Sequence, residues 1–466
     1  MSRARRSRTA AAFAAALGAA NILAIANMSA SPAGVSVSAP DRALPSSPND
    51  VPLVEPHLAA HPTDARRLVG AAIVIKTPDF GETDCATFAS ADGGATWTRR
   101  DLGLKQCADP WVSILPDGTA VLAVLEGEGS LLVFRSTDGA ASWTKTADLG
   151  AGHDHETLAV DPKSGALYLL SVQGATEPAS GRRLDSVFAA RSDDGGRTFR
   201  TPARLFPNNL STNTMTGAVL SDDSLAVSFT SFARPSEREA QVWLDPITSW
   251  LTRSYDGGKT LAAADWVSSS CGRSFPQLVA DASPGASRDR LYWLCNGRAS
   301  GVSSMPDFER IVLSSSADRG ARWSDPVTVA GGGGRAYVRN AVAAVNKDGV
   351  VGVSWYDGRN EKNRSKQSFS CLDVYFAASF DGGRTFAPET RVSADSSCGD
   401  APANGNAKFR WPAGGDYHGL AARADGTFQI LWADSRDGIY RLHTATVTAA
   451  GTPDVPATDA RTKEKK

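Results

Sequence analysis

The chain has 466 residues, of which 42% are hydrophobic, and its 49 Lys and Arg residues nearly balance its 50 Asp and Glu residues. This composition is typical of a large globular protein with enough apolar residues to build a core. A formal net charge of −1 gives no indication of binding to nucleic acid or to an anionic membrane surface. We therefore expect neither of these as a partner of the mature protein.

The N-terminal segment has the layout of a secretory signal peptide. Its first nine residues include four arginines, Arg3, Arg5, Arg6 and Arg8. An Ala-rich apolar run follows over residues 10–26, and the small residues Ser29 and Ala30 suit cleavage. We predict that residues 1–30 are removed and that the mature protein is secreted, outside the cell or into the periplasm. An uncleaved membrane anchor is the alternative, and the paired arginines leave a twin-arginine export route open.

Export makes disulfides the expected state of the six cysteines, because extracellular compartments are oxidising. Six cysteines formally allow 15 pairings. Their order along the chain groups them into pairs separated by 22 to 27 residues: Cys85 with Cys107, Cys271 with Cys295, and Cys371 with Cys398. No pair has the Cys-x-x-Cys spacing of a zinc site, and we expect neither a bound metal nor another cofactor.

An eight-residue pattern occurs six times along the chain, first as Ser90-Ala-Asp92-Gly-Gly94-Ala-Thr96-Trp97. The aspartates of the six copies are Asp92, Asp138, Asp194, Asp256, Asp318 and Asp381. Their spacing of 46 to 63 residues accommodates one four-stranded blade per copy. In such a pattern the Asp accepts backbone N–H groups across a tight turn, and Gly tolerates positive φ. Two copies deviate, with Leu261 in place of the final aromatic residue and Arg322 before Trp323.

The repeated pattern resembles the Asp box, or bacterial neuraminidase repeat, of sialidases and many other secreted propellers. The resemblance covers residues 49–450 and implies an all-β fold, a β-propeller of four-stranded antiparallel blades in which the repeated aspartates are structural. A further unit starts near Tyr417, after the last copy of the pattern. Seven blades are therefore favoured, with the six of sialidase domains as the alternative.

Only three strands are evident in the last unit. A propeller commonly closes its ring with a strand from the other terminus, and residues 51–54 are predicted to supply that strand. Residues 31–48 are predicted to be a Ser/Pro-rich linker, and residues 451–466 a disordered polar tail.

The antiparallel order of a blade places the starts of first strands and the ends of second strands on one rim, opposite the repeated Asp turns. Rim loops are where ligands are expected to bind. Five arginines fall at these positions and are predicted to bind substrate: Arg273, Arg339, Arg359, Arg410 and Arg436. Converging guanidinium groups would suit a carboxylate or a sulfate. The alternative is that Arg359 and Arg436 form local ion pairs with the aspartates two residues before them.

Acidic residues fall on the same rim in other blades. Asp109, Glu156 and Tyr417 are the predicted catalytic residues, because carboxyl groups near a tyrosine are the ingredients of sialidase-type glycoside hydrolysis. The resemblance to sialidases implies an aspartate acid/base, a tyrosine–glutamate nucleophile pair and an arginine triad. The nearest match to the family's Phe/Tyr-Arg-Ile-Pro motif is Phe409-Arg410-Trp411-Pro412, which precedes the last blade instead of the first. No glutamate partner for Tyr417 is evident in the sequence.

Two functions fit these features without a metal. The first is a secreted propeller that recognises an acidic glycan or glycoconjugate and, if catalytic, hydrolyses it as an exo-sialidase-type glycoside hydrolase. The second is a non-catalytic module that binds a protein or a cell surface through rim loops over residues 175–185, 235–247 and 360–370. In either case we expect a monomer.

A third hypothesis is metal-dependent chemistry at His153, His155 and Glu156, because strand alternation would place both imidazoles on one face. It requires a further ligand near both histidines.

A binding module should leave the rim residues dispersed, whereas a sialidase-like enzyme should bring four of them into a pocket about 10 Å across: Asp109, Tyr417, Arg339 and Arg410.

Overall fold

The structure is a computed structural model, and it describes residues 34–46, 50–179, 181, 183–207, 211–233, 244–268, 271, 275–297, 310–332, 337–361, 371–451 and 453–454. The predicted signal peptide, residues 455–466 and most of the predicted rim loops 235–247 and 360–370 lie outside the described residues. Within the described part, no helix is long and apolar enough to cross a membrane.

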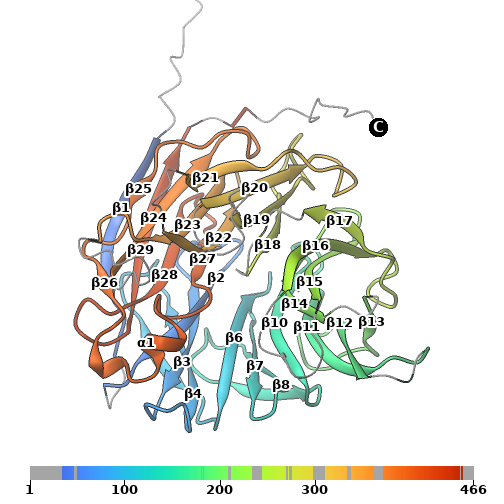
Figure 1. The fold of residues 1–466 in the computed structure, drawn as a ribbon, viewed down its shortest axis with the longest axis horizontal. Coiled ribbons are helices and arrows are strands. Elements are labelled where there is room, and N and C mark those ends of the chain that lie inside the picture. The colour runs from blue at the N-terminus through green and yellow to red at the C-terminus, as the bar shows by residue number, and fades with distance from the viewer. Residues whose placement is uncertain are drawn as a thin grey trace, which may run out of the picture. The chain divides into compact units, whose positions relative to one another are not determined.

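The strands form seven antiparallel sheets around a common centre, which confirms the predicted seven-bladed β-propeller (Figure 1). Blades one to six follow chain order, and blade seven combines β27, β28 and β29 with β1. The first strand of each blade lies nearest the centre in Figure 1. A short strand, β26, adds to the edge of blade six by pairing with β24.

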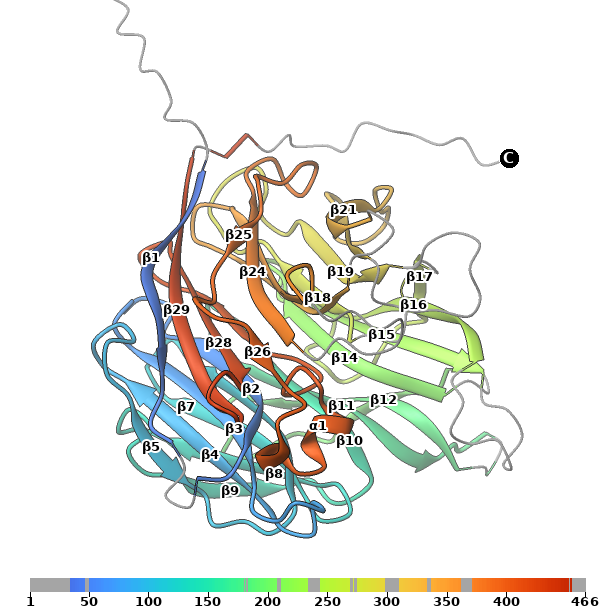
Figure 2. The same cartoon turned by 60° about the vertical axis from the view of Figure 1, so that its left-hand side comes forward.

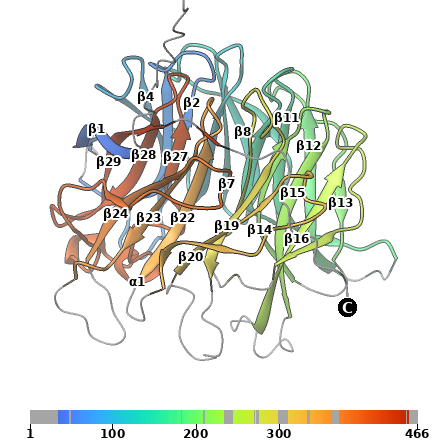
Figure 3. The same ribbon diagram turned by 90° about the horizontal axis from the view of Figure 1, so that it is seen from above.

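The strands of the first three blades are β2 (Leu53–Ala60), β3 (Leu68–Ile75), β4 (Thr83–Ser90), β5 (Thr98–Asp101), β6 (Cys107–Ile114), β7 (Ala120–Glu126), β8 (Ser130–Ser136), β9 (Thr144–Asp148), β10 (His153–Val160), β11 (Leu167–Thr176), β12 (Arg183–Ser192) and β13 (Ala203–Leu205). Blades four and five contain β14 (Ser211–Val219), β15 (Leu225–Ala233), β16 (Leu244–Ser254), β17 (Asp265–Ser268), β18 (Gln277–Ala280), β19 (Leu291–Gly297), β20 (Arg310–Ser316) and β21 (Val327–Gly331). The remaining elements are β22 (Val338–Val345), β23 (Val351–Asp357), β24 (Cys371–Ser379), β25 (Thr390–Arg391), β26 (Ser397–Cys398), η2 (Pro402–Asn404), α1 (Ala407–Arg410), β27 (Gly419–Ala422), β28 (Phe428–Asp434), β29 (Arg441–Ala450) and β1 (Gly34–Ala43). The short helix α1 lies at one edge of the ring and precedes the start of β27 (Figure 3).

The ring is closed by β1, which pairs with β29 from Gly34↔Ala450 to Ala43↔His443 (Figure 2). The prediction that residues 31–48 are a linker and that residues 51–54 close the ring was therefore wrong. Leu53 and Val54 instead begin β2 of blade one. The Ser-rich composition obscured an alternation of small apolar and polar residues over 35–39, in which Val35 and Val37 pack against the core between blades six and seven.

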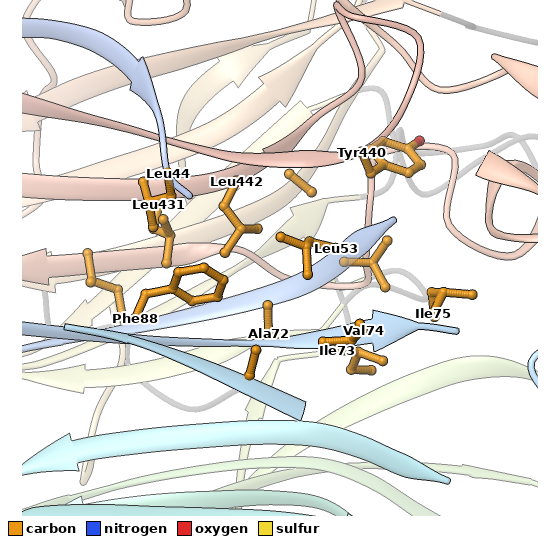
Figure 4. Packing of buried hydrophobic residues seen from close by; sticks show 14 of the residues in the cluster. Leu44, Leu53, Ala72, Ile73, Val74, Ile75, Phe88, Leu431, Tyr440 and Leu442 are labelled. Atoms are coloured by element: carbon orange, nitrogen blue, oxygen red, sulfur yellow. The ribbon is translucent and has the colours of Figure 1, made fainter. Parts of the chain in front are cut away.

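The core consists of apolar clusters between neighbouring sheets. Leu44, Leu53, Phe88, Leu431 and Leu442 belong to the cluster that joins blade one to blade seven (Figure 4). Each remaining pair of adjacent blades has a cluster of the same kind. Every sheet therefore buries apolar side chains on both of its faces, which is why its strands are rich in Val, Leu and Ala.

All three predicted disulfides are confirmed. Cys85–Cys107 joins β4 of blade one to β6 of blade two. Cys271–Cys295 and Cys371–Cys398 lie within blades five and six. Three disulfides fit an extracellular protein, as the export prediction requires.

The repeated pattern forms a hydrogen-bonded turn between the third and fourth strands of a blade. Asp92 Oδ1 accepts the Thr96 backbone N–H at 2.9 Å and Asp92 Oδ2 accepts the Thr96 hydroxyl at 2.6 Å, while Ser90 Oγ accepts the Gly94 N–H at 2.8 Å. In the deviating fifth copy, the Arg322 guanidinium takes the place of the hydroxyl and donates to Asp318 at 2.7 Å. Hydrogen bonds to Asp92, the strongest from Thr96, hold the pKa of its carboxyl group at about 2. In the second copy, hydrogen bonds to Asp138, the strongest from Ser142, hold the pKa of that carboxyl group at about 2 as well.

We predict that these turns make stability depend on acid pH. A carboxyl group whose pKa is lowered on folding stabilises the fold above its unfolded pKa near 3.8, and that stabilisation is lost as pH falls towards 2. Asp138→Asn should lower the free energy of unfolding by about 0.5–1 kcal/mol at pH 7 and by less at pH 2. Urea denaturation at both pH values measures this, with Asp437→Asn, at an exposed position, as the matched control. A loss that is equal at both pH values would contradict the prediction.

We also predict that β1 is needed for the ring to be stable. A mature chain that starts at residue 50 leaves β29 with an unpaired edge, and it also removes Asp41, which pairs with Arg436 at 2.7 Å. This chain should melt at least several degrees below the chain that starts at residue 31 and should associate through the open edge. Differential scanning calorimetry and light scattering test this, and equal melting temperatures would refute it.

Candidate active site at the centre of the ring

Among the described residues, the first strands of four blades carry the same kind of bulge near the strand start. In each, a residue other than glycine has positive φ: Glu55 (52°), Asp109 (49°), His155 (51°) and Asn340 (53°). The strand registers shift at these residues. Positive φ is uncommon outside glycine, and such backbone strain clusters at functional sites. The bulges occupy the rim at which the sequence predicted the site.

Two cavities that share lining residues lie along the first strands. The larger, of about 160 Å³, is lined by a residue from every blade: His57, Trp111, Thr157, Thr216, Gln277, Val342 and His418, among others. The other cavity shares Trp111 and Thr157 with it and adds Phe275. Burial lowers the pKa of His57 to about 3, so its ring is neutral and stacks on Trp111 with 3.7 Å between ring centroids.

The three predicted catalytic residues lie together. Asp109 of blade two, Glu156 of blade three and Tyr417 before blade seven all line the second cavity. The Tyr417 and Trp111 ring centroids are 6.0 Å apart. The site therefore combines two carboxyl groups, a phenol and the apolar surface of aromatic rings.

Glu55, which the prediction did not include among the catalytic residues, is hydrogen-bonded to Asp109. It is 2% exposed, and its Oε1 accepts the backbone N–H of Asp416 at 3.1 Å. Burial, with the nearby Asp109 and Asp416 charges, raises the pKa of Glu55 well above its usual value, and burial also raises the pKa of Asp109. Gly415 packs against it, and a Cβ at this glycine would lie 2.8 Å from the Glu55 Cα, so a larger residue would displace the pair.

Glu156 is a buried carboxyl group without a neighbouring partner. It is 1% exposed, and neither carboxyl oxygen has a hydrogen bond to another described residue. Burial, followed by the charges of Asp109 and Asp154, raises its pKa well above the usual value. Buried polar groups in folded proteins are nearly always hydrogen-bonded, so an exception in a cavity indicates a ligand site.

Tyr417 is also buried with a hydroxyl that has no hydrogen-bond partner among the described residues. Burial, then Glu55, Asp109 and Glu156, raises its pKa well above the usual value. The glutamates that the sequence could not pair with Tyr417 are thus its neighbours in space. Burial, together with these carboxyl groups, disfavours the phenolate that a tyrosine nucleophile needs, so Tyr417 is suited to donate a hydrogen bond.

The predicted arginines do not join these residues, and none of the four that the structure describes lines either cavity. Arg359 pairs with Asp357 and Glu389, and Arg436 with Asp434 and Asp41. These are the local ion pairs that the alternative interpretation expected.

The other predicted arginines lie elsewhere. Arg410 is 59% exposed and lies 3.3 Å from Asp416. Arg339 is buried and donates to Asn340 Oδ1 and to the Tyr337 hydroxyl. Arg273 lies outside the described residues. The predicted convergence of arginines with Asp109 and Tyr417 is therefore not seen among the described residues.

The prediction that His153 and His155 share one face was wrong, because the bulge at His155 interrupts strand alternation. His153 is buried within blade three, where its ring bonds to Ser171 Oγ at 2.7 Å. His155 instead faces the cavity and lies 4.7 Å from the Phe275 ring. The ligand atoms that lie close enough to hold a metal come from Asp109, Asp154 and His155, all within 4.8 Å of one another.

No protein-family model and no curated protein sequence matches the chain. Similar solved structures include a Hadza microbial sialidase, with 15% identity over 79% of this chain and 73% of that one and a TM-score of 0.43. An α-L-arabinofuranosidase from Fusarium graminearum has 11% identity over 89% and 98% of the chains and a TM-score of 0.49. An ulvan lyase has 11% identity over 88% of this chain and 96% of that one, with a TM-score of 0.49. Similarities this distant carry no argument about the activity of this chain.

We predict that Tyr417→Phe leaves the fold as stable as the wild type, or up to about 1 kcal/mol more stable, because it removes a buried hydroxyl without a partner. The matched control is Tyr440→Phe. Tyr440 is also buried, but its hydroxyl donates to the Trp411 carbonyl at 3.0 Å, so this variant should lose about 1 kcal/mol. Urea denaturation followed by tryptophan fluorescence compares the two. Equal destabilisation would mean that the Tyr417 hydroxyl has a structural role.

Proposed function

We propose that this protein is a glycan-degrading enzyme, a glycoside hydrolase whose active site is the cavity lined by Asp109, Glu156, Tyr417 and Trp111. The observation that carries the proposal is the meeting of two carboxyl groups and a phenol, from three blades far apart in the chain, in one cavity. Most glycoside hydrolases use a pair of carboxyl groups that flank the scissile bond.

The side chains have complementary roles in this proposal. Glu156, whose oxygens are not engaged by other described residues, donates a proton to the glycosidic oxygen. Asp109 supplies the second carboxyl group, and the Tyr417 hydroxyl donates a hydrogen bond to the sugar. The ring of Trp111, fixed by stacking on His57, offers an apolar surface to a sugar face.

The charge of the site favours a neutral sugar over the acidic glycan of the sialidase-type hypothesis. Glu55, Asp154 and Asp416 add carboxyl groups around Asp109 and Glu156. Among the described residues, no lysine or arginine lines either cavity. A sugar carboxylate here would meet like charge without the arginine partners that usually bind it.

The test is release of fluorophore from a panel of neutral aryl glycosides and a sialoside by the purified mature protein. We expect turnover of a neutral glycoside, and Glu156→Gln should lower kcat by about 10²–10⁴-fold. Glu128→Gln, at an exposed position of blade two, is the matched control and should keep full activity. Turnover of the sialoside alone would restore the acidic-glycan hypothesis. No turnover of any sugar would refute the hydrolase and favour the non-catalytic binding module.

A further inference from the structure

The carboxyl groups of Asp109 and Asp154 and the imidazole of His155 form a compact set. Their ligand atoms all lie within 4.8 Å of one another, although Asp109 is on β6 and the other two are on β10. The bulge at His155 makes this possible, because it releases His155 from the face that His153 occupies and turns it towards the neighbouring blade. His155 Nε2 is 3.7 Å from Asp154 Oδ2.

A second observation indicates a ligand in the cavity beside this set. Glu156 follows His155, lines the cavity with it and with Asp109, and is 1% exposed with neither carboxyl oxygen bonded to another described residue. A buried carboxyl group in this state has hydrogen-bonding capacity that the described side chains do not use, and a ligand in the cavity can use it.

Further carboxyl groups surround this set. Glu55, Glu156 and Asp416 lie near Asp109, and Asp416 is paired with Arg410 at 3.3 Å. Within the described chain, His155 is the sole basic side chain that lines the second cavity. Buried carboxylates are normally compensated by cations or by metal ions.

We propose that Asp109, Asp154 and His155 bind one divalent metal ion. Two carboxylate oxygens and one imidazole nitrogen leave coordination positions open to water or to a substrate hydroxyl, as in sites with three protein ligands. The mixed oxygen and nitrogen set suits Zn²⁺ or Mn²⁺ better than Ca²⁺, which prefers oxygen alone.

The surrounding residues fit the outer shell of such a site. Asp109 is hydrogen-bonded to Glu55, which orients its carboxylate, and Phe275 packs on the His155 ring. The ion would fix the Asp109 carboxylate beside Glu156. The proposed metal site is independent of which substrate the protein acts on.

The test is isothermal titration calorimetry of the mature protein, dialysed against EDTA, with ZnCl₂ and separately with MnCl₂. We expect one ion per chain, and a rise in melting temperature of several degrees at saturation. Asp154→Asn and His155→Gln should each weaken binding at least tenfold. Asp154 is 61% exposed, so its variant should fold normally, which circular dichroism verifies. Asp437→Asn, at an exposed position elsewhere, is the matched control and should bind like the wild type.

Either of two results would overturn the proposal: no stoichiometric binding of Zn²⁺ or Mn²⁺, or wild-type binding by both ligand variants. If the wild type binds metal and the two variants do not, the metal site is supported even when no glycoside is cleaved. In that case only the hydrolase proposal is refuted. Conversely, glycoside turnover without metal binding supports the hydrolase proposal and refutes the metal site.

Discussion

Apolar packing between neighbouring sheets is the interaction on which the rest of this structure depends. In blade one, Leu53 and Phe88 belong to the cluster shared with blade seven, while Val69 and Ala71 belong to the cluster shared with blade two. A sheet that is apolar on both faces has no stable existence alone, and only a closed ring gives each sheet two neighbours. For this reason the pairing of β1 with β29 belongs to the core of the fold, although residues 34–43 look like a linker by composition.

The same ring creates the site. Innermost strands converge on one centre, so residues near their starts meet there whatever their separation along the chain, as Asp109, Glu156 and Tyr417 do. Regular strands would alternate between two faces that are both buried in the core. The bulges at residues such as Asp109 and His155 break that alternation, at a cost of about 1 kcal/mol or more for each strained residue. The core clusters between blades offset this strain, which isolated sheets would not sustain.

Local patterns made much of the fold predictable. The turn at Asp92 and its five counterparts all contain the same hydrogen-bonded Ser and Asp, so the pattern is visible in the sequence and identifies the blades. Blade topology then led to the rim that carries the bulges and to three residues that do share a cavity. The arginines misled because a guanidinium group's partners are decided in space: Arg436 is held by Asp434, as the alternative expected, and also by Asp41 from the other end of the chain. The bulge at His155 has no sequence signature, so the sequence alone could not show that His153 and His155 lie on different faces of the strand.

The buried carboxyl groups of the site oppose the stability that the blades supply. Glu55 and Asp109 are hydrogen-bonded to each other and can share a proton, but the buried Glu156 has no such partner among the described residues. The arginines that would neutralise them are already engaged at the blade edges, as Arg359 is by Asp357. Burying uncompensated charge costs several kcal/mol. Any negative charge that remains on the buried carboxyl groups must therefore be offset by a proton, a metal ion or a bound ligand. A cluster in this state is adapted to bind a cation and to transfer a proton, and for the same reason it is poorly adapted to hold an acidic sugar.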